Sequence, residues 1–262
     1  MWTHNLSPTL LSLGPIEIRW YGLVYVFGAL FSLWWLLQLQ KKGQLKLSKD
    51  AVWDFIFYCL LGIIIGARLF MIVWQPQIYL KNPLELLYVW KGGMSFHGGL
   101  VGIIVSGYIF CRKQKIPFLR MADLMSFPTM VALALGRVAN FINGELVGKV
   151  WNGAWCVVFP GQEECRHPST LYAAAKRFAL ASWLYFLSIK AFTLQFKTGF
   201  IFWNFIFIEG LGRFIIDFFR LDLIHLGLSV GQWMSLIMII VSGTILLKQH
   251  KKDFASIINP AN

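Results

Sequence analysis

Seven long runs of apolar residues, separated by short polar segments, make up most of the chain. Each run has the length of a membrane-spanning helix, which needs roughly 17–25 mostly apolar residues, so the pattern predicts seven spans. The fifth run is the least regular, because Lys176 and Arg177 interrupt it; their long side chains can snorkel to the interface, or the first turn lies outside the hydrocarbon. The predicted spans cover approximately residues 18–39, 52–74, 94–111, 121–142, 171–189, 200–219 and 230–247.

The composition agrees with an all-α, polytopic membrane protein. Apolar residues make up 57% of the chain and charged residues only 14%, whereas soluble domains have about 45–50% and about 25%. The net charge of +12 does not indicate nucleic-acid binding, because the basic residues form short clusters between the apolar runs, as topology signals do. We therefore expect membrane lipids, and no nucleic acid, around this protein.

The distribution of lysine and arginine predicts the orientation of the spans. One set of connecting segments, which includes the C-terminal tail, carries 13 basic residues, and the other set carries six. Because cytoplasmic loops are enriched in lysine and arginine, the C-terminus is predicted to be cytoplasmic, and seven spans then place the N-terminus outside. We expect a single integral membrane domain, 1–262, with two longer outer-face loops at about 75–93 and 143–170.

The four cysteines do not form a CxxC motif, so neither a metal site nor a redox motif is expected. Cys156 and Cys165 share the second outer loop. A disulfide between them is possible if this loop lies outside the cytoplasm.

Several charged residues fall within or near the ends of the predicted spans, where a charge costs at least about 2.5–3.5 kcal/mol and often marks function. Glu209, Arg213, Asp217 and Arg220 follow one another at steps of four, four and three, and therefore share one face of a helix. They could form a salt-bridged stripe that stabilises the bundle. For Arg213 we favour a functional role, because several other polar groups are available to meet it.

The stretch "GRVANFINGELVG", residues 136–148, places Arg137, Asn140, Asn143 and Glu145 at the end of the fourth span. One interpretation is a polar helix cap in which Arg137 pairs with an acid. The other is a phosphate site, since a guanidinium group suits phosphate oxygens and the amides can orient hydroxyl groups. The pattern alone does not decide between them.

Three further features have both structural and chemical interpretations. His97 lies between two glycine pairs and could act as a general base, although a structural histidine is the more common case. Tyr21 at a span start is typical of an interface anchor. In "RHPSTLY", residues 166–172, Ser169 or Thr170 is expected to cap the fifth span, and Asp123 to cap the fourth or to balance an arginine.

Six blocks of the sequence together resemble the motifs of the bacterial prolipoprotein diacylglyceryl transferases, in that family's order. They are "IRWYGL", "GAR" at 66–68, "GGMSFHGG", "GRVANFINGELVG", "RHPSTLY" and "GRFIIDFFR". The resemblance covers nearly the whole chain. It implies an enzyme of the bacterial inner membrane that transfers the diacylglyceryl group of phosphatidylglycerol to the lipobox cysteine of a prolipoprotein. A thioether forms and glycerol-1-phosphate is released, in the first step of lipoprotein maturation and without metal or cofactor.

The resemblance also implies roles for individual residues. Catalytic roles fall to four of them, namely Arg137, Arg213, His97 and Tyr21. Substrate binding falls to Arg137 again and to Asn140, Asn143, Glu145, Gly148 and Arg220. The chain departs from the family pattern at three positions, where Asp217 replaces Glu, Thr170 replaces Gln and Ala173 replaces Glu. Ala173 puts a local polar contact in doubt, but not the reaction.

Two other classes of protein could also place charges within the membrane. A small transporter or channel would line a path with them, although no repeated halves or paired interrupted helices are visible. A structural scaffold would use them for stability alone. No nucleophile motif is present either, so an enzyme of this sequence would depend on a nucleophile supplied by its substrate.

Overall fold

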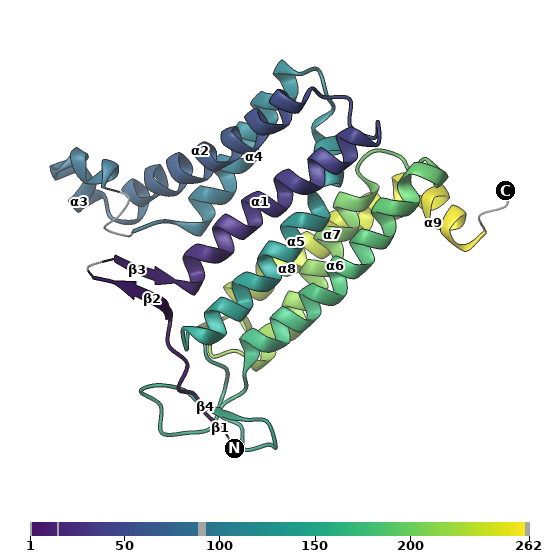
Figure 1. Cartoon of the computed structure of the whole chain (residues 1–262). Helices are drawn as coiled ribbons and strands as arrows, with labels where there is room; N and C mark the ends of the chain where they lie inside the picture. Colours follow the sequence, from purple (N-terminus) through teal and green to yellow (C-terminus); the bar gives the residue numbers. More distant parts are fainter. Residues whose placement is uncertain (1, 15, 89–92, 260–262) are drawn as a thin grey trace. The chain divides into compact units, whose positions relative to one another are not determined.

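The computed structural model describes residues 2–14, 16–88 and 93–259. Its long helices each overlap one predicted span (Figure 1). They are α1 (Trp20–Lys41), α2 (Lys49–Trp74), α4 (Phe96–Lys113), α5 (Phe118–Ile142), α6 (Ser169–Leu194), α7 (Phe200–Ile216) and α8 (Val230–Gln249). Four of them, α1, α2, α5 and α8, are long and apolar enough to cross a membrane. The expectation of a helical membrane protein is thereby confirmed.

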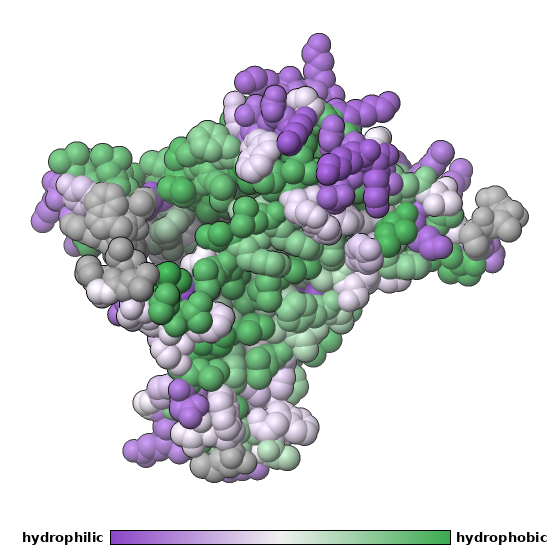
Figure 2. All heavy atoms as spheres, viewed as in Figure 1, coloured by the Kyte–Doolittle hydropathy of each residue, from purple (hydrophilic) through white to green (hydrophobic). Residues whose placement is uncertain are grey.

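Apolar side chains cover the flanks of the helices, and hydrophilic residues gather beyond their ends (Figure 2). Large apolar residues on α2 and α8 are exposed, for example Ile65 and Ile240. Water would not favour such a surface, whereas lipid chains would. The chain is therefore an integral membrane protein.

The chain divides into two compact units, which are described separately. Unit 1 contains Met1–Phe31 and Ala122–Asn262, and unit 2 contains Ser32–Met121.

Unit 2 is built around the close packing of α2 against α4. A Cβ atom on Gly66 would collide with the backbone oxygen of Gly98, and one on Gly102 would collide with that of Gly62. Two small-xxx-small pairs therefore let the two helix backbones touch, as is common in membrane helices. The predicted outer loop 75–93 contains two short helices, α3 (Pro76–Lys81) and a 3-10 helix, η1 (Pro83–Leu87).

Unit 1 has a core formed by α5, α6, α7 and α8, with Met130, Leu184, Leu187 and Phe200 almost fully buried. The buried carboxylate of Asp123 accepts the backbone N–H groups of Gly199 (2.7 Å) and Phe202 (2.8 Å). It therefore caps the N-terminus of α7, where a negative charge is favourable. Of the two alternatives expected for Asp123, a cap of its own helix, α5, is wrong; the balancing of an arginine stays a prediction.

Short two-stranded pairings and two small helices complete unit 1. Strand β1 (Trp2–Thr3) pairs in parallel with β4 (Val157–Val158), and β2 (Thr9–Leu13) is antiparallel to β3 (Ile16–Arg19). Strand β5 (Ile224–His225) is antiparallel to β6 (Leu228–Ser229), and the helices are the 3-10 helix η3 (Asp217–Phe219) and α9 (Lys251–Ile258). The pairing of β1 with β4 ties the N-terminal segment to the loop 143–170.

Candidate active site

The polar residues of "GRVANFINGELVG" form one hydrogen-bonded chain at the end of α5. Gly144 adopts a left-handed backbone (φ 69°) just past the helix, which turns the chain back on itself. Glu145 can then accept hydrogen bonds from the amides of Asn140 (2.9 Å) and Asn143 (3.2 Å). The side-chain oxygen of Asn140, Oδ1, in turn accepts a hydrogen bond from Arg137 Nη1 at 3.2 Å. Asn140 thus fixes Arg137 directly, and Glu145 with Asn143 fixes Asn140.

The contacts predicted among the last three members of the charged face are confirmed, although only Arg213 lies on α7; Asp217 begins η3 and Arg220 follows it in extended backbone. Asp217 is buried, with its carboxylate oxygens 3.7 Å from Arg213 Nε and 3.9 Å from Arg220 Nε. Ser229 Oγ, at the N-terminus of α8, donates to the same carboxylate at 3.4 Å. Arg220 also forms an ion pair with Asp222 at 2.9 Å.

Glu209, the first member of that face, pairs with α6 instead. Lys176 Nζ contacts Glu209 Oε2, and Arg177 Nη2 lies 2.5 Å from Glu209 Oε1. Arg177 is only 7% exposed, so it does not snorkel to the interface as the sequence interpretation allowed. These two cations do not interrupt the helix; they form a buried triad with a carboxylate on the neighbouring helix.

A pocket lies where these groups meet. Its charged lining has five cations and two carboxylates, which are Arg137, Lys176, Arg177, Arg213 and Arg220 with Glu209 and Asp217. The formal excess of positive charge is three. Three buried polar atoms of its lining have no hydrogen-bond partner in the described part of the chain, namely Arg213 Nε, Arg220 Nε and Thr170 Oγ1. Arg220 Nε lies beside the Asp222 carboxylate (2.9 Å) but forms no hydrogen bond to it.

Such a pocket suits an anion with several oxygen atoms. Buried donors without partners are costly, and a bound phosphate would satisfy them. The excess charge would favour the same ligand, because the buried arginines repel one another until an anion enters. The phosphate-site interpretation of Arg137 and Arg213 therefore has a physical basis that the cap interpretation lacks.

The loop 143–170 positions the Arg220 side of the pocket. Gly148 pairs with Arg220 in an antiparallel bridge, and its N–H donates to the oxygen of His167 at 3.2 Å. A Cβ atom at Gly148 would collide with the His167 oxygen and approach the Phe219 oxygen to 2.8 Å. Only glycine fits between these two segments, so Gly148 acts here through the backbone.

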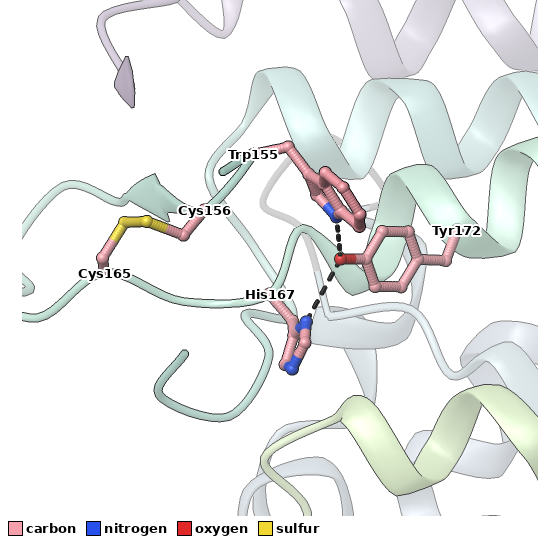
Figure 3. The surroundings of a disulfide bond; sticks show 5 residues. All are labelled: Trp155, Cys156, Cys165, His167 and Tyr172. Atoms are coloured by element: carbon pink, nitrogen blue, oxygen red, sulfur yellow. Dashed lines mark hydrogen bonds between the residues drawn. A yellow bond between two sulfur atoms is a disulfide. The ribbon is translucent and has the colours of Figure 1, made fainter. Parts of the chain in front are cut away.

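Figure 3 shows the part of this loop in which Cys156 and Cys165 form a disulfide. Beyond it, Tyr172 Oη accepts a hydrogen bond from Trp155 Nε1 (2.8 Å) and lies 3.1 Å from His167 Nδ1. His167 also stacks on Trp151, with ring centroids 4.4 Å apart. Burial lowers the pKa of His167 below its ordinary value. The possible disulfide of the sequence analysis is thus present.

The expected caps of α6 are wrong. Ser169 Oγ donates to the Leu146 oxygen at 3.0 Å, which fastens the start of α6 to the "GELVG" turn. Thr170 Oγ1 lines the pocket without a partner. The N-terminal turn of α6 therefore contributes to the pocket wall, and neither hydroxyl caps the helix.

His97 and Tyr21 are not among the described residues that line the pocket. His97 is exposed in the first turn of α4, where its ring contacts Phe96 at 5.7 Å, and it belongs to unit 2, whereas the pocket belongs to unit 1. Tyr21 lies in the first turn of α1 in unit 1 and packs against Tyr25 at 5.4 Å.

Three residues in or beside the pocket were not predicted from the sequence as part of the site. Lys176 and Arg177 could have been found by asking which buried cations balance Glu209, since buried charges are normally paired. Gly231 in the first turn of α8 gave no such signal. A Cβ atom there would collide with Asp217 Oδ2 and approach Arg213 Nη2 to 2.9 Å. A side chain at this position would separate the two ion-pair partners.

The chain is similar to known proteins along most of its length. Residues 8–248 match the family model of the prolipoprotein diacylglyceryl transferases. A phosphatidylglycerol–prolipoprotein diacylglyceryl transferase of Rickettsia africae is 38% identical over 256 residues, which are 95% of this chain and 98% of the relative. A relative of the same name from a Wolbachia strain of Culex pipiens is 37% identical over 255 residues, 93% and 95% of the two chains. The chain therefore belongs to the prolipoprotein diacylglyceryl transferase family.

Proposed function

We propose that this protein transfers the diacylglyceryl group of phosphatidylglycerol to the lipobox cysteine of a prolipoprotein, as the first step of lipoprotein maturation. The observation that carries the proposal is the pocket with five cations against two carboxylates and three unpartnered polar atoms. A phosphate group of an anionic lipid fits its charge and its donors. The names of the similar proteins, phosphatidylglycerol–prolipoprotein diacylglyceryl transferases, agree with that ligand.

The reaction forms one bond and breaks one. The cysteine sulfur attacks the carbon of the diacylglyceryl group that is bonded to the phosphate oxygen. A C–S bond forms, and the C–O bond between that carbon and the phosphate breaks. The products are the thioether and glycerol-1-phosphate, and the thiol proton passes to a base. Negative charge grows on the departing phosphate, and Arg137 and Arg213 stabilise it from the pocket.

The remaining motif residues orient these groups. Asn140, Asn143 and Glu145 hold Arg137 and offer hydrogen bonds to the glycerol head group. Gly148 and Arg220 close the outer side of the pocket. Tyr21 is assigned to the site on the family resemblance alone.

The thiol has an ordinary pKa of about 8.5 and must lose its proton to attack well. His97 is the candidate base, with a head-group oxygen or water as alternatives. Replacing His97 with glutamine should remove an ionisation from the pH–rate profile if His97 is the base. An unchanged profile would exclude His97 from that role.

The membrane arrangement is part of the proposal. We place seven spans of one integral membrane domain in the bacterial inner membrane, with the N-terminus and the loops 75–93 and 143–170 on the outer face. The C-terminus is then cytoplasmic. Lys46 and Glu163 are exposed and are each replaced by a single cysteine in a background in which the native cysteines are Ser. Labelling in intact cells should place the two on opposite sides; the same side for both would contradict this topology.

One assay tests the reaction. The purified protein is incubated with labelled phosphatidylglycerol and a peptide that carries a lipobox, and the peptide mass is measured. A mass gain of one diacylglyceryl group is expected on the Cys peptide and none on a Ser peptide. Flux of a solute without a covalent product would favour a transporter, and no product or flux would favour a scaffold.

A further inference from the structure

The pocket contains a cation that none of the family motifs accounts for, Lys176 on α6. Its side chain is 18% exposed and lines the same pocket as Arg137 and Arg213. We propose that Lys176 is a further phosphate-binding residue of this pocket, kept available by Arg177 and Gly212. This inference rests on the proposed function and adds a residue to its substrate site.

Arg177 is the residue that satisfies Glu209. Its Nε and Nη2 atoms lie 3.0 Å and 2.5 Å from Glu209 Oε1, and its Nη1 donates to the Leu133 oxygen at 3.2 Å. The triad of two cations and one carboxylate keeps a charge of +1. Because the donors of Arg177 are directed at Glu209 and the backbone, that charge is available at the ammonium of Lys176.

The ammonium group has donors to spare. It carries three N–H groups, and its one hydrogen bond to a described residue goes to Glu209 Oε2. The contact with Glu209 fixes the position of the ammonium without using all of its donors. A phosphate oxygen in the pocket can therefore be its second partner.

The backbone of α7 is shaped for the stem of this lysine. A Cβ atom on Gly212 would lie only 2.6 Å from Lys176 Cδ and 2.9 Å from Cγ. The alkyl chain thus crosses α7 at Gly212, where no side chain blocks it, immediately before Arg213. Ala173, one turn earlier on α6, also lines the pocket and leaves room beside the lysine.

The chemistry of the reaction gives this extra charge a purpose. The lipid phosphate is a diester with one negative charge, whereas glycerol-1-phosphate is a monoester that carries up to two. An additional cation therefore stabilises the departing phosphate more than the bound lipid. Lys176 should act mainly on kcat, and on the affinity for the released product.

The test compares Lys176→Met with the wild-type enzyme in vesicles that contain phosphatidylglycerol. Methionine keeps an unbranched stem, and Arg177 remains to satisfy Glu209. We expect kcat to fall by about tenfold to a hundredfold, as for loss of a charged hydrogen bond. Inhibition by added glycerol-1-phosphate should weaken by a similar factor, while KM for the lipid changes less. Lys176→Arg should restore most of the activity.

Two further variants serve as controls. Lys190→Met removes an exposed lysine on the same helix, whose ammonium lies 5.9 Å from the Phe186 ring, and should leave kinetics unchanged. Gly212→Ala keeps the charge of Lys176 but displaces its stem, and should also weaken inhibition by glycerol-1-phosphate. This variant decides the question if Lys176→Met does not fold.

The outcomes distinguish a failure of the proposed function from a failure of the inference about Lys176. If the wild-type protein forms no thioether product, the proposed function fails. If the wild type is active and folded Lys176→Met keeps its kcat and its product inhibition, the inference about Lys176 is wrong. A lower melting temperature with unchanged kinetics would likewise leave Lys176 as a structural partner of Glu209 only.

Discussion

Each unit of the molecule contains a buried arginine environment, and the two environments are opposite in their hydrogen bonding. In unit 2, Arg68 is 4% exposed and donates to the backbone oxygens of Leu86 (3.0 Å), Gly93 (2.7 Å), Glu85 (2.7 Å) and Tyr88 (2.6 Å). All four belong to the segment that follows α2. Arg68 therefore fastens the segment after α2 to that helix, and the protein itself satisfies its charge.

In unit 1 the arginines of the pocket are incompletely satisfied. Among the described residues, the buried Nε atom of Arg213 has no hydrogen-bond partner, and Arg137 hydrogen-bonds to Asn140. Arg68 is more deeply buried than Arg213, since the Arg213 side chain is 36% exposed; the protein itself compensates the charge of Arg68, whereas the Nε donor of Arg213 is left for a ligand. Burial alone thus does not identify a binding arginine in a membrane protein; the count of satisfied donors does.

The largest expected effect is at Arg137. Replacing it with alanine removes a phosphate contact that strengthens in the transition state, so kcat/KM should fall by about 100- to 1000-fold. The melting temperature should not fall, because the neighbouring cations lose a repelling charge. The measurement pairs the lipid-transfer assay with thermal unfolding of the same sample. Full activity would contradict the phosphate-site role.

Arg68→Ala should show the reverse pattern. Several carbonyl oxygens of the segment after α2 would lose their hydrogen-bond donor. Each carbonyl left unsatisfied should lower the stability by about 1–3 kcal/mol. We expect a loss of at least about 3 kcal/mol in the free energy of unfolding, with nearly normal kcat/KM for folded enzyme assayed well below its melting temperature. If this variant were stable but inactive, Arg68 would belong with the binding arginines and the comparison would fail.

Much of the helical fold could be predicted from the sequence because apolar runs of this length have few alternatives. The limits lie where two segments meet. Asp123 caps α7, a partner 76 residues away in sequence, and no local pattern in α5 contains that information. Helix ends show the same effect, since α6 starts at Ser169, whose hydroxyl bonds to the Leu146 oxygen instead of capping the helix.

The site divides in the same way. Periodicity predicted the face that joins Arg213, Asp217 and Arg220, because those contacts lie within one stretch of chain. It could not pair Glu209 with Lys176 and Arg177, which are more than 30 residues away on another helix. Charge balance was the available signal. Gly231 had none, since its importance comes from the ion pair that lies against it.

Within the motif 136–148, two glycines sharpen the comparison at the pocket rim. Gly148→Ala would push the His167 and Phe219 segments apart, with an expected loss of about 1–3 kcal/mol in stability. The displacement of Arg220 should also lower kcat/KM by about tenfold. The matched control is Gly136→Ala, which faces open space within α5 and should gain about 0.5–1 kcal/mol. Equal effects from both substitutions would contradict the packing argument.

The smallest expected effect on stability concerns His167, which helps to hold the loop 143–170 by aromatic packing and not by ion pairing. Burial lowers the pKa of His167, so the folded state binds a proton less readily than the unfolded state. Its contribution to stability is complete above the unfolded pKa of about 6.5 and is lost as the pH falls towards the lower folded value.

His167→Phe keeps the stack on Trp151 (4.4 Å in the wild type) but cannot titrate. The decrease in melting temperature between pH 7.5 and 5.5 should therefore be smaller in this variant, by at most about 2–4 °C. The other histidines contribute equally to both proteins and cancel in the difference. An identical decrease would mean that water reaches the imidazole freely, and the rim would then be held by the disulfide and the backbone contacts of Gly148 without help from the aromatic stack.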